Sequence, residues 1–378
     1  MKKNIMAKAV KVVAKANRQG KAEERPKAPK KGALVAAGLD IGDKECQACG
    51  RDKSGKVVLE RKVKTSRAGL EGTFKALAPC RIVVEAGSQT RWIAKALLDM
   101  GHEVKVVDPR RMRRIYESDN KSDVRDAREL SEAALDRWER LPEVRLRSKE
   151  SQEKLSVLRT RDTLVRARTR LVNTARSLLK QYGIKVPKCE PEAFPKRASG
   201  LVPEELLVAG KALLEQIRLL NAQVKGLDGW IESQSAQDAR IRCLRQIPGI
   251  GRVTAAAFVW TIDDPYRFKR SRSVGAYLGL RPKREQSGET DKQLPITKAG
   301  NRYLRALLVS AAQGIMRKKS KDTALKRFGL RLAERGGKRA KKIAAVALAR
   351  KLAVLLHHLW VTGEAYEPFP EMRAKRAA

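Results

Sequence analysis

Short apolar runs rich in β-branched residues follow one another from Leu34 to about residue 109. They are LVAAGLDIG (34–42), KVVLERKVK (56–64), RIVVEAG (81–87) and HEVKVVDP (102–109), and a further strand is expected around Cys46 and Cys49. Before the last run, TRWIAKALLDMG (90–101) has the spacing of an amphipathic helix. Strands that alternate with a helix in this way predict an α/β domain over residues 33–145.

A heptad pattern replaces the strands after residue 150. Apolar residues recur at Leu158, Val165, Val172 and Leu179, with a parallel series at Leu164, Leu171 and Leu178. A second helical run over 204–233 follows a connection containing Pro and Gly over 187–203. Residues 150–236 are therefore expected to form a coiled-coil region. An antiparallel hairpin within one chain and a coil between chains fit this pattern about equally well.

The next segment, residues 237–365, is predicted to be a helical domain. In CLRQIPGIGRVTAAAFVWTID (243–263), Gly249 and Gly251 lie between two apolar stretches, which is the layout of a helix-hairpin-helix. Further helices are expected over 273–280, 301–317 and 340–360. The polar stretch between residues 281 and 300 is predicted to be a long loop, and loops of that length usually have a function.

The charge of the chain indicates a polyanionic partner. Its 83 Lys and Arg against 42 Asp and Glu give a formal net charge of +41, which favours nucleic acid. Residues 1–32 are expected to be a flexible basic arm, and 366–378 a tail. A membrane is not expected, because there is no signal peptide and charged or histidine side chains interrupt the apolar stretch 343–361. The five cysteines have no disulfide spacing and suit a reducing cytoplasm.

Several basic residues and glycines are candidates for contacts with phosphate groups, and such contacts imply no base specificity. Aromatic residues make up only 4% of the chain, which argues against the reading of unpaired bases by stacking. The candidate phosphate-binding residues are Arg110, Arg111, Arg113, Arg114, Gly249, Gly251, Arg252, Arg302 and Arg305.

Four carboxylates stand out by their placement. Asp40 lies in an apolar strand, Glu85 ends another strand, and Asp123 and Asp126 share one face of a helix. Each has an ordinary explanation: a turn acceptor, a strand-end charge or a solvated helix face. Together they provide what a two-Mg²⁺ site for phosphoryl transfer needs, because hard cations prefer oxygen ligands. We therefore expect both aspartates to point towards Asp40, with Lys121, Arg125 and Arg128 placed to meet phosphate or balance the acids.

The order of the short motifs along the chain is more specific than any one of them. GLDIG, VVEAG and KSDVRDA, followed by IPGIG, YLGLRP, QSG and ITKAGNRYLR, resemble the DEDD transposases of the insertion-sequence one-ten family over roughly residues 33–312. The resemblance implies an RNase H-like (RuvC-like) N-terminal domain in which Asp40, Glu85, Asp123 and Asp126 bind the metal. It also implies a helical C-terminal transposase domain whose serine, here Ser287, attacks DNA and forms a 5′-phosphoserine.

The same resemblance implies partners. These are donor and target DNA, a noncoding bridge RNA that selects both by pairing, and a homo-oligomer, dimer or tetramer, whose composite site joins domains of two subunits. Two other functions fit the charge equally well. A RuvC-like nuclease would hydrolyse branched DNA with water and not need Ser287, and an architectural nucleic-acid-binding protein would need none of the four acids.

Overall fold

The computed structural model describes residues 34–108, 112, 122–334 and 336–370. The chain divides into two compact units, Met1–Leu146 and Arg147–Ala378. The expected basic arm and the candidate phosphate-binding residues of the RRMRR run lie outside the described residues; the latter are Arg110, Arg111, Arg113 and Arg114.

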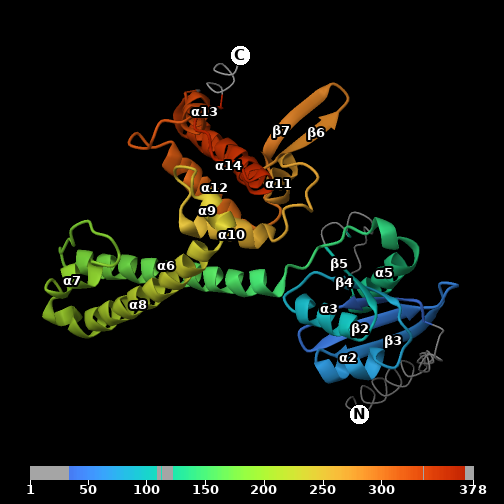
Figure 1. Ribbon diagram of the computed structural model, residues 1–378. Coiled ribbons are helices and arrows are strands. Elements are labelled where there is room, and N and C mark those ends of the chain that lie inside the picture. Colours follow the sequence, from blue (N-terminus) through green and yellow to red (C-terminus); the bar gives the residue numbers. More distant parts are fainter. Residues whose placement is uncertain (1–33, 109–111, 113–121, 335, 371–378) are drawn as a thin grey trace, which may run out of the picture. The chain divides into compact units, whose positions relative to one another are not determined.

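A five-stranded mixed sheet forms the N-terminal unit (Figure 1). Its order is β3-β2-β1-β4-β5, with β1 antiparallel to β2 and parallel to β4. All of the strands predicted from the apolar runs are present, and the sheet is compatible with an RNase H-like fold. The strands are β1 (Ala36–Asp40), β2 (Glu45–Arg51), β3 (Val57–Lys64), β4 (Arg81–Glu85) and β5 (Glu103–Val107).

Helices cover both faces of this sheet. On one face, α2 (Arg67–Phe74) and α3 (Thr90–Asp99) pack against a cluster that includes Leu39 and Val84. On the other, α5 (Asp123–Asp136) packs against Ala36 and Val83. Helix α2 was not predicted, because it is short and contains two glycines. It begins at Ser66, whose hydroxyl accepts a hydrogen bond from the Gly69 amide.

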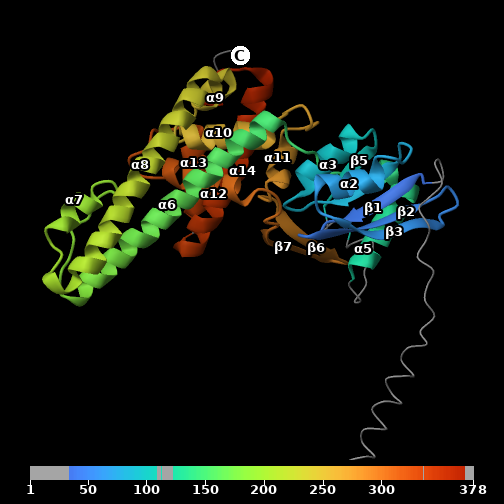
Figure 2. The same cartoon turned by 90° about the horizontal axis from the view of Figure 1, so that it is seen from below.

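Two long helices, α6 (Lys149–Gln181) and α8 (Leu207–Gln237), pack along each other in antiparallel directions within the chain (Figure 2). The connection between them contains the short helix α7 (Phe194–Ser199) and the 3-10 turn η2 (Glu204–Leu206). Of the two arrangements open to the heptad pattern, the chain adopts the hairpin. Buried residues follow the alternating three- and four-residue spacing of a seam; they are Leu158, Val172, Ala175 and Leu179 on α6, and Leu214, Ile217, Val224 and Ile231 on α8.

Polar pairs interrupt the apolar seam of this hairpin at two levels. Arg161 donates two hydrogen bonds to the carboxylate of Asp228, at 2.7 and 3.2 Å. Arg168, only 7% exposed, donates to Glu192 at 2.6 Å and to Asn221 at 3.0 Å. A guanidinium buried in a seam without such partners would be costly, so these contacts favour one register of α6 on α8.

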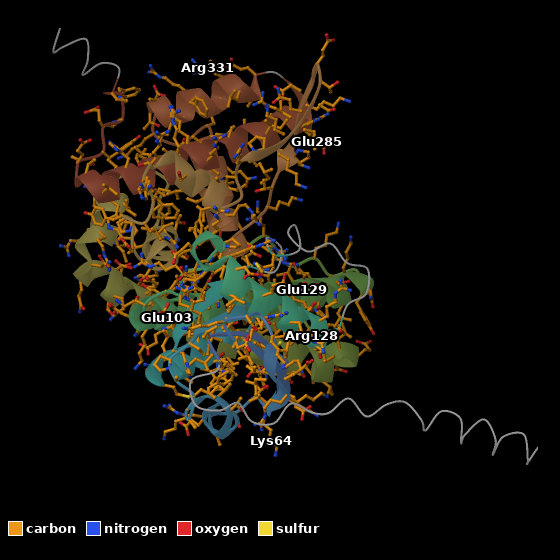
Figure 3. The ribbon with its side chains drawn as sticks, turned by 90° about the vertical axis from the view of Figure 1, so that its right-hand side faces the viewer. Lys64, Glu103, Arg128, Glu129, Glu285 and Arg331 are labelled. Carbon is orange, nitrogen blue, oxygen red and sulfur yellow. The ribbon has the colours of Figure 1, made fainter. Side chains whose placement is uncertain are left out.

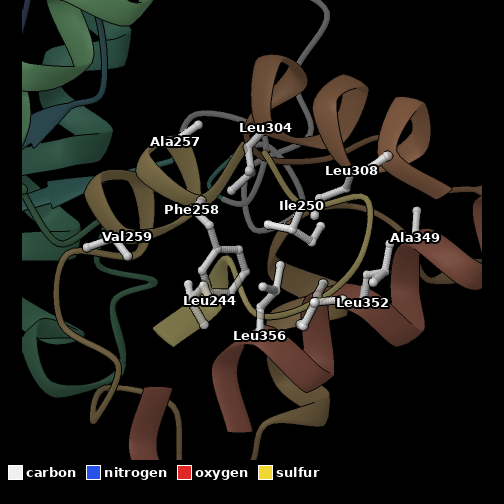
Figure 4. Packing of buried hydrophobic residues seen from close by; sticks show 14 of the residues in the cluster. Leu244, Ile250, Ala257, Phe258, Val259, Leu304, Leu308, Ala349, Leu352 and Leu356 are labelled. Carbon is white, nitrogen blue, oxygen red and sulfur yellow. The ribbon is translucent and has the colours of Figure 1, made fainter. Parts of the chain in front are cut away.

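The remaining helices form a core around α10 (Arg252–Ile262), which is buried on almost every side. Figure 4 shows Phe258 of α10 among apolar side chains of the surrounding elements. The surrounding helices are α9 (Ala239–Leu244), α11 (Arg272–Tyr277), α12 (Arg302–Ile315), α13 (Ala324–Ala333) and α14 (Gly337–Thr362). Helix α14 is long and apolar enough to cross a membrane, but one of its faces is buried in this core, from Ala344 to Leu359.

The prediction of a loop over 281–300 was wrong in part. The segment forms an antiparallel hairpin of β6 (Pro282–Ser287) and β7 (Thr290–Ile296). Both faces are mostly exposed, so the strands have no alternation of apolar and polar residues by which they could be recognised. Arg284 and Asp291 hold the strands together through two hydrogen bonds of 2.7 and 2.8 Å.

The Arg161–Asp228 pair gives a test of the helical hairpin. Replacing Asp228 by Ala leaves the Arg161 guanidinium in the seam without its carboxylate, and we expect the free energy of unfolding to fall by about 1–3 kcal/mol. Urea unfolding followed by circular dichroism measures this change. Glu215→Ala, at an exposed position of α8, is the control. Equal effects of the two substitutions would contradict the role of the polar pair.

Candidate active site

Asp40 and Glu85 lie at the carboxyl ends of two adjacent parallel strands. Leu39 of β1 pairs with Val84 of β4, so the next residue on each strand, Asp40 or Glu85, reaches the same edge of the sheet. Side chains alternate between faces along a strand. Leu39 and Val84 face α2 and α3, and Asp40 and Glu85 therefore share the opposite face, which α5 covers.

Helix α5 lies directly on β1 because Gly38 has no side chain. A Cβ atom at Gly38 would be 2.4 Å from both the carbonyl oxygen of Ala127 and the amide nitrogen of Ser131. The sheet-facing residues of α5 include Ala127, Leu130, Ser131 and Ala134. One turn earlier, the same stripe of the helix carries Asp123 and Asp126.

Two arginines fix the direction of α5 along the sheet. Arg51, which pairs with Ala36 at the start of β1, donates to the Ser131 hydroxyl at 2.9 Å and lies 3.6 Å from Glu132. Arg128 of α5 binds Glu60 of β3 at 2.8 Å. The later turns of α5 therefore lie over the start of β1. Its first turn lies towards the end of β1, where Asp40 is.

Arg125 and Arg128 each pair with an acid outside the four candidates. Arg125 pairs with Glu129 at 3.2 Å, one turn along α5, and Arg128 pairs with Glu60. Figure 3 shows Arg128 and Glu129 projecting from α5. These two arginines hold the helix and its neighbours in place, and Lys121 lies outside the described residues.

The four acids share an edge of the sheet, but they are not gathered into one cluster. Asp126 is half-buried, whereas Asp123 is exposed, contrary to the expectation that both point inward. Asp123 is the first residue of α5, and it lines an open depression instead of a packed interface. Within the described residues, no three Asp, Glu, His or Cys side chains are close enough to hold a metal ion. The donors fit a hard divalent cation in type, since all four offer oxygen.

A depression of about 700 Å³ adjoins this edge of the sheet. Asp123 lines it together with residues of the β1–β2 turn and Gln47, the partner of Asp40 in the ladder. Three lysines also line it, Lys44, Lys62 and Lys64, and the last is labelled in Figure 3. The sequence alone did not single out these lysines, which lie where a phosphate group could approach the acids.

Cys46 lies beside Asp40 and is not a reactive thiol. Burial, and to a lesser degree the negative charge of Asp40, raise the pKa of the Cys46 thiol. Burial also raises the pKa of Cys49, whose Sγ accepts a hydrogen bond from Ser131 on the α5 side of the sheet. Cys46 instead belongs to the cluster on the other face, so Cys46 and Cys49 do not form a metal-binding pair.

Ser287 is at the exposed tip of the β6–β7 hairpin. It pairs with Thr290 across a turn in which Gly288 has φ +54°. Glycine readily takes this left-handed conformation. The Ser287 side chain makes no hydrogen bond with any other residue of the described ranges, so its hydroxyl is open to a substrate.

The other candidate phosphate-binding residues have mixed surroundings. Gly251 leaves the start of α10 open, since a Cβ there would meet nothing within 4 Å. Gly249 (φ +90°) packs tightly against Ile315, which explains that glycine without a ligand. Arg252 already pairs with Glu232 of α8 at 3.3 Å.

Arg302 and Arg305 lie at the start of α12 and differ in their contacts. Arg305 donates to the carbonyl oxygens of Leu278 and Ala299, at 2.9 and 3.0 Å. Burial, together with the nearby charge of Arg302, lowers the pKa of Arg305. Arg302 is exposed, so of this pair it is the better placed for a phosphate.

Comparison with known proteins decides the family. A DEDD transposase model for IS110 matches residues 37–184, and a model described as the transposase IS116/IS110/IS902 family matches residues 241–327. The transposase for insertion sequence element IS1111A of Coxiella burnetii is 33% identical over 340 residues, which cover 87% of this chain and 90% of the relative. The chain belongs to the IS110 family of DEDD transposases.

Other relatives of this IS110-family transposase agree. A Pseudomonas aeruginosa protein described as a probable family 20 transposase is 31% identical over 351 residues, which span 89% of this chain and 99% of the relative. The transposase for element IS1328 of Yersinia enterocolitica is 28% identical over 330 residues, or 85% and 95% of the two chains. The chain is therefore an enzyme that cleaves and transfers DNA, and its DEDD domain implies dependence on a divalent metal.

The contact at Gly38 predicts that a single methyl group inactivates the transposase. Gly38→Ala forces α5 off β1, which moves Asp123 and Asp126, and overpacking of this kind typically costs about 1–3 kcal/mol. DNA cleavage and thermal unfolding measure the two effects. Gly72→Ala in α2, where a Cβ would meet nothing within 4 Å, is the matched control and should be neutral or slightly stabilising. Full activity of Gly38→Ala would contradict the proposed placement of α5.

Proposed function

We propose that this transposase is a metal-dependent, RNA-guided DNA recombinase that excises and inserts its own mobile element. The observation that carries the proposal is the shared placement of Asp40, Glu85, Asp123 and Asp126. Two of these acids end neighbouring strands on the face that α5 covers, and the other two continue the sheet-facing stripe of α5 at the same edge.

In this proposal the four carboxylates hold Mg²⁺, most simply two ions. Divalent cations bound there would supply positive charge to the attacking and leaving oxygens of a phosphodiester. The protein's own contribution is to hold the acids on rigid elements. The hydrogen bond from Arg51 to Ser131 and the ion pair of Arg128 with Glu60 support this role, because they keep α5 from sliding along the sheet.

Ser287 is the proposed nucleophile. Its Oγ attacks the phosphorus, an Oγ–P bond forms, and the bond from phosphorus to the 3′ oxygen breaks. The proton of the serine hydroxyl ends on the departing 3′ oxygen, and the product is a 5′-phosphoserine. The exposed position at a hairpin tip supports this role, because an extended strand of DNA can reach the hydroxyl there.

Guidance by a noncoding bridge RNA is the proposed source of sequence choice. The net charge of +41 supports binding of RNA and DNA backbones together, and the low aromatic content supports a protein that does not itself read unpaired bases. In this proposal base pairing selects donor and target DNA, and the protein recognises shape and charge. Strand exchange takes place in a homo-oligomer, a dimer or a tetramer.

The acidic site is tested by removing one charge from α5. Asp126→Asn keeps the size of the side chain but lowers the affinity for a divalent cation, and we expect DNA cleavage to fall at least about a hundredfold. Glu129→Gln, an acid three residues further along α5 that pairs with Arg125, is the matched control. Gel assays of excision across a Mg²⁺ titration measure both variants. Equal activity of the two variants would contradict the proposed role of Asp126.

The nucleophile is tested by the covalent adduct. Ser287→Ala should abolish the protein–DNA adduct detected on denaturing gels and leave RNA binding unchanged, because only the attacking oxygen is removed. Thr290→Val removes the hydroxyl directly opposite in the hairpin and serves as control. If neither the wild type nor Ser287→Ala forms an adduct, and Ser287→Ala still nicks DNA, the result would instead favour the hydrolytic nuclease.

A further inference from the structure

A groove of about 780 Å³ lies in the C-terminal unit between α14, α13 and the base of the β6–β7 hairpin. Its floor is apolar, with Leu280, Ile296, Phe328, Ile343 and Val346 among the lining residues. Ile343 is 55% exposed. Helix α14 thus carries two apolar stripes, one buried in the core and one open in the groove.

Five cationic side chains and no acids line this groove. They are Arg272, Arg339, Lys342, Arg350 and Lys351. Elsewhere in the unit arginines are commonly paired, as Arg161 is with Asp228 and Arg327 with Asp322. Throughout the described part of the chain, no carboxylate forms an ion pair with any of the five. The groove therefore keeps an uncompensated positive charge.

Packing holds two of these cations in place. The stem of Arg350 lies against Gly275 of α11, where an added Cβ would be 3.1 Å from the Cγ of the arginine. The ammonium group of Lys351 lies 4.5 Å from the centre of the Phe328 ring. Such contacts reduce the freedom that each side chain would lose on binding a ligand.

We propose that this groove binds an unpaired stretch of nucleic acid, with the phosphates on the cations and the sugars and bases on the apolar floor. A polyanion matches five cations without acids, whereas a second copy of this chain would bring its own net positive charge. The groove has the size of a pocket for a drug-sized molecule, so it takes about one or two nucleotides and excludes a duplex.

The groove lies close to the tip of the β6–β7 hairpin. One wall is β7, from Gln293 to Ile296, and the same strand begins at Thr290, the partner of Ser287. Three residues of β-strand span about 10 Å. A strand held in the groove is thus close to the hairpin tip that carries the proposed nucleophile. The binding itself needs no cleavage, so it can be tested apart from the function proposed above.

The test compares charge reversals inside and outside the groove in the full-length chain. Arg339→Glu with Lys342→Glu should weaken binding of a single-stranded oligonucleotide about tenfold and reduce the slope of log K against log salt by about 1.4. Lys318→Glu with Lys319→Glu makes the same change of net charge outside the groove. Fluorescence anisotropy with labelled single-stranded DNA, RNA of the same sequence, and duplex DNA measures all of them, and thermal unfolding checks the fold.

A third variant separates the apolar floor from the charge. Ile343→Ser leaves the net charge unchanged and should weaken binding of the single strand but not of the duplex. The DNA and RNA arms tell whether a DNA strand or the guide RNA occupies the groove. Three results would overturn the proposal. The first is an equal loss of binding in both charge-reversal pairs, and the second is unchanged binding by Ile343→Ser. The third is that the groove variants dissociate an oligomer of the chain while oligonucleotide binding stays intact.

Discussion

The contact between Gly38 of β1 and the backbone of α5 determines where the acids of the N-terminal unit lie. No side chain fits between the strand and the helix, since even a Cβ at Gly38 would come within 2.4 Å of main-chain atoms. The helix therefore rests on the strand itself. Asp40 lies two residues after the contact on the same face of β1, and Asp126 directly precedes Ala127, so the contact sets where both lie.

Much of this arrangement could be predicted because it follows from local periodicity. Helical spacing places Asp123 and Asp126 together, and alternation sets the face of Asp40 on β1 and of Glu85 on β4, whereas the register of the two strands makes that face a common one. Gly38 of GLDIG also carries a signal of its own, since a glycine inside a strand often marks close approach of another backbone. Periodicity could not predict the exposure of Asp123, which depends on how the first turn of α5 lies on the sheet.

Other features depend on partners distant in the sequence, which local periodicity does not reveal. Arg252 looks like a phosphate ligand after IPGIG, yet its charge is taken up by Glu232, twenty residues earlier on α8. Arg305 is tied to two carbonyl oxygens. The β6–β7 hairpin is polar on both faces, so it has no pattern to detect. Basic residues that look equivalent in the sequence thus differ in whether the fold already pairs them.

The basic residues of the chain therefore fall into two groups, those that the fold pairs and those that it leaves unpaired within the described residues. In the α6–α8 hairpin, guanidinium groups are paired within the seam and help to fix the register. In the groove beside α14, five cations line an apolar floor with no acid among them. The first group serves the fold, and the second is available to a polyanion.

In the proposed function, Asp40, Glu85, Asp123 and Asp126 form one metal-binding site. Titration of the full-length protein with Mn²⁺, followed by electron paramagnetic resonance of the free ion, measures this directly. We expect saturable Mn²⁺ binding that both Asp40→Asn and Glu85→Gln abolish or weaken strongly, with unchanged thermal unfolding. Binding that is the same in the wild type and in both variants would contradict it.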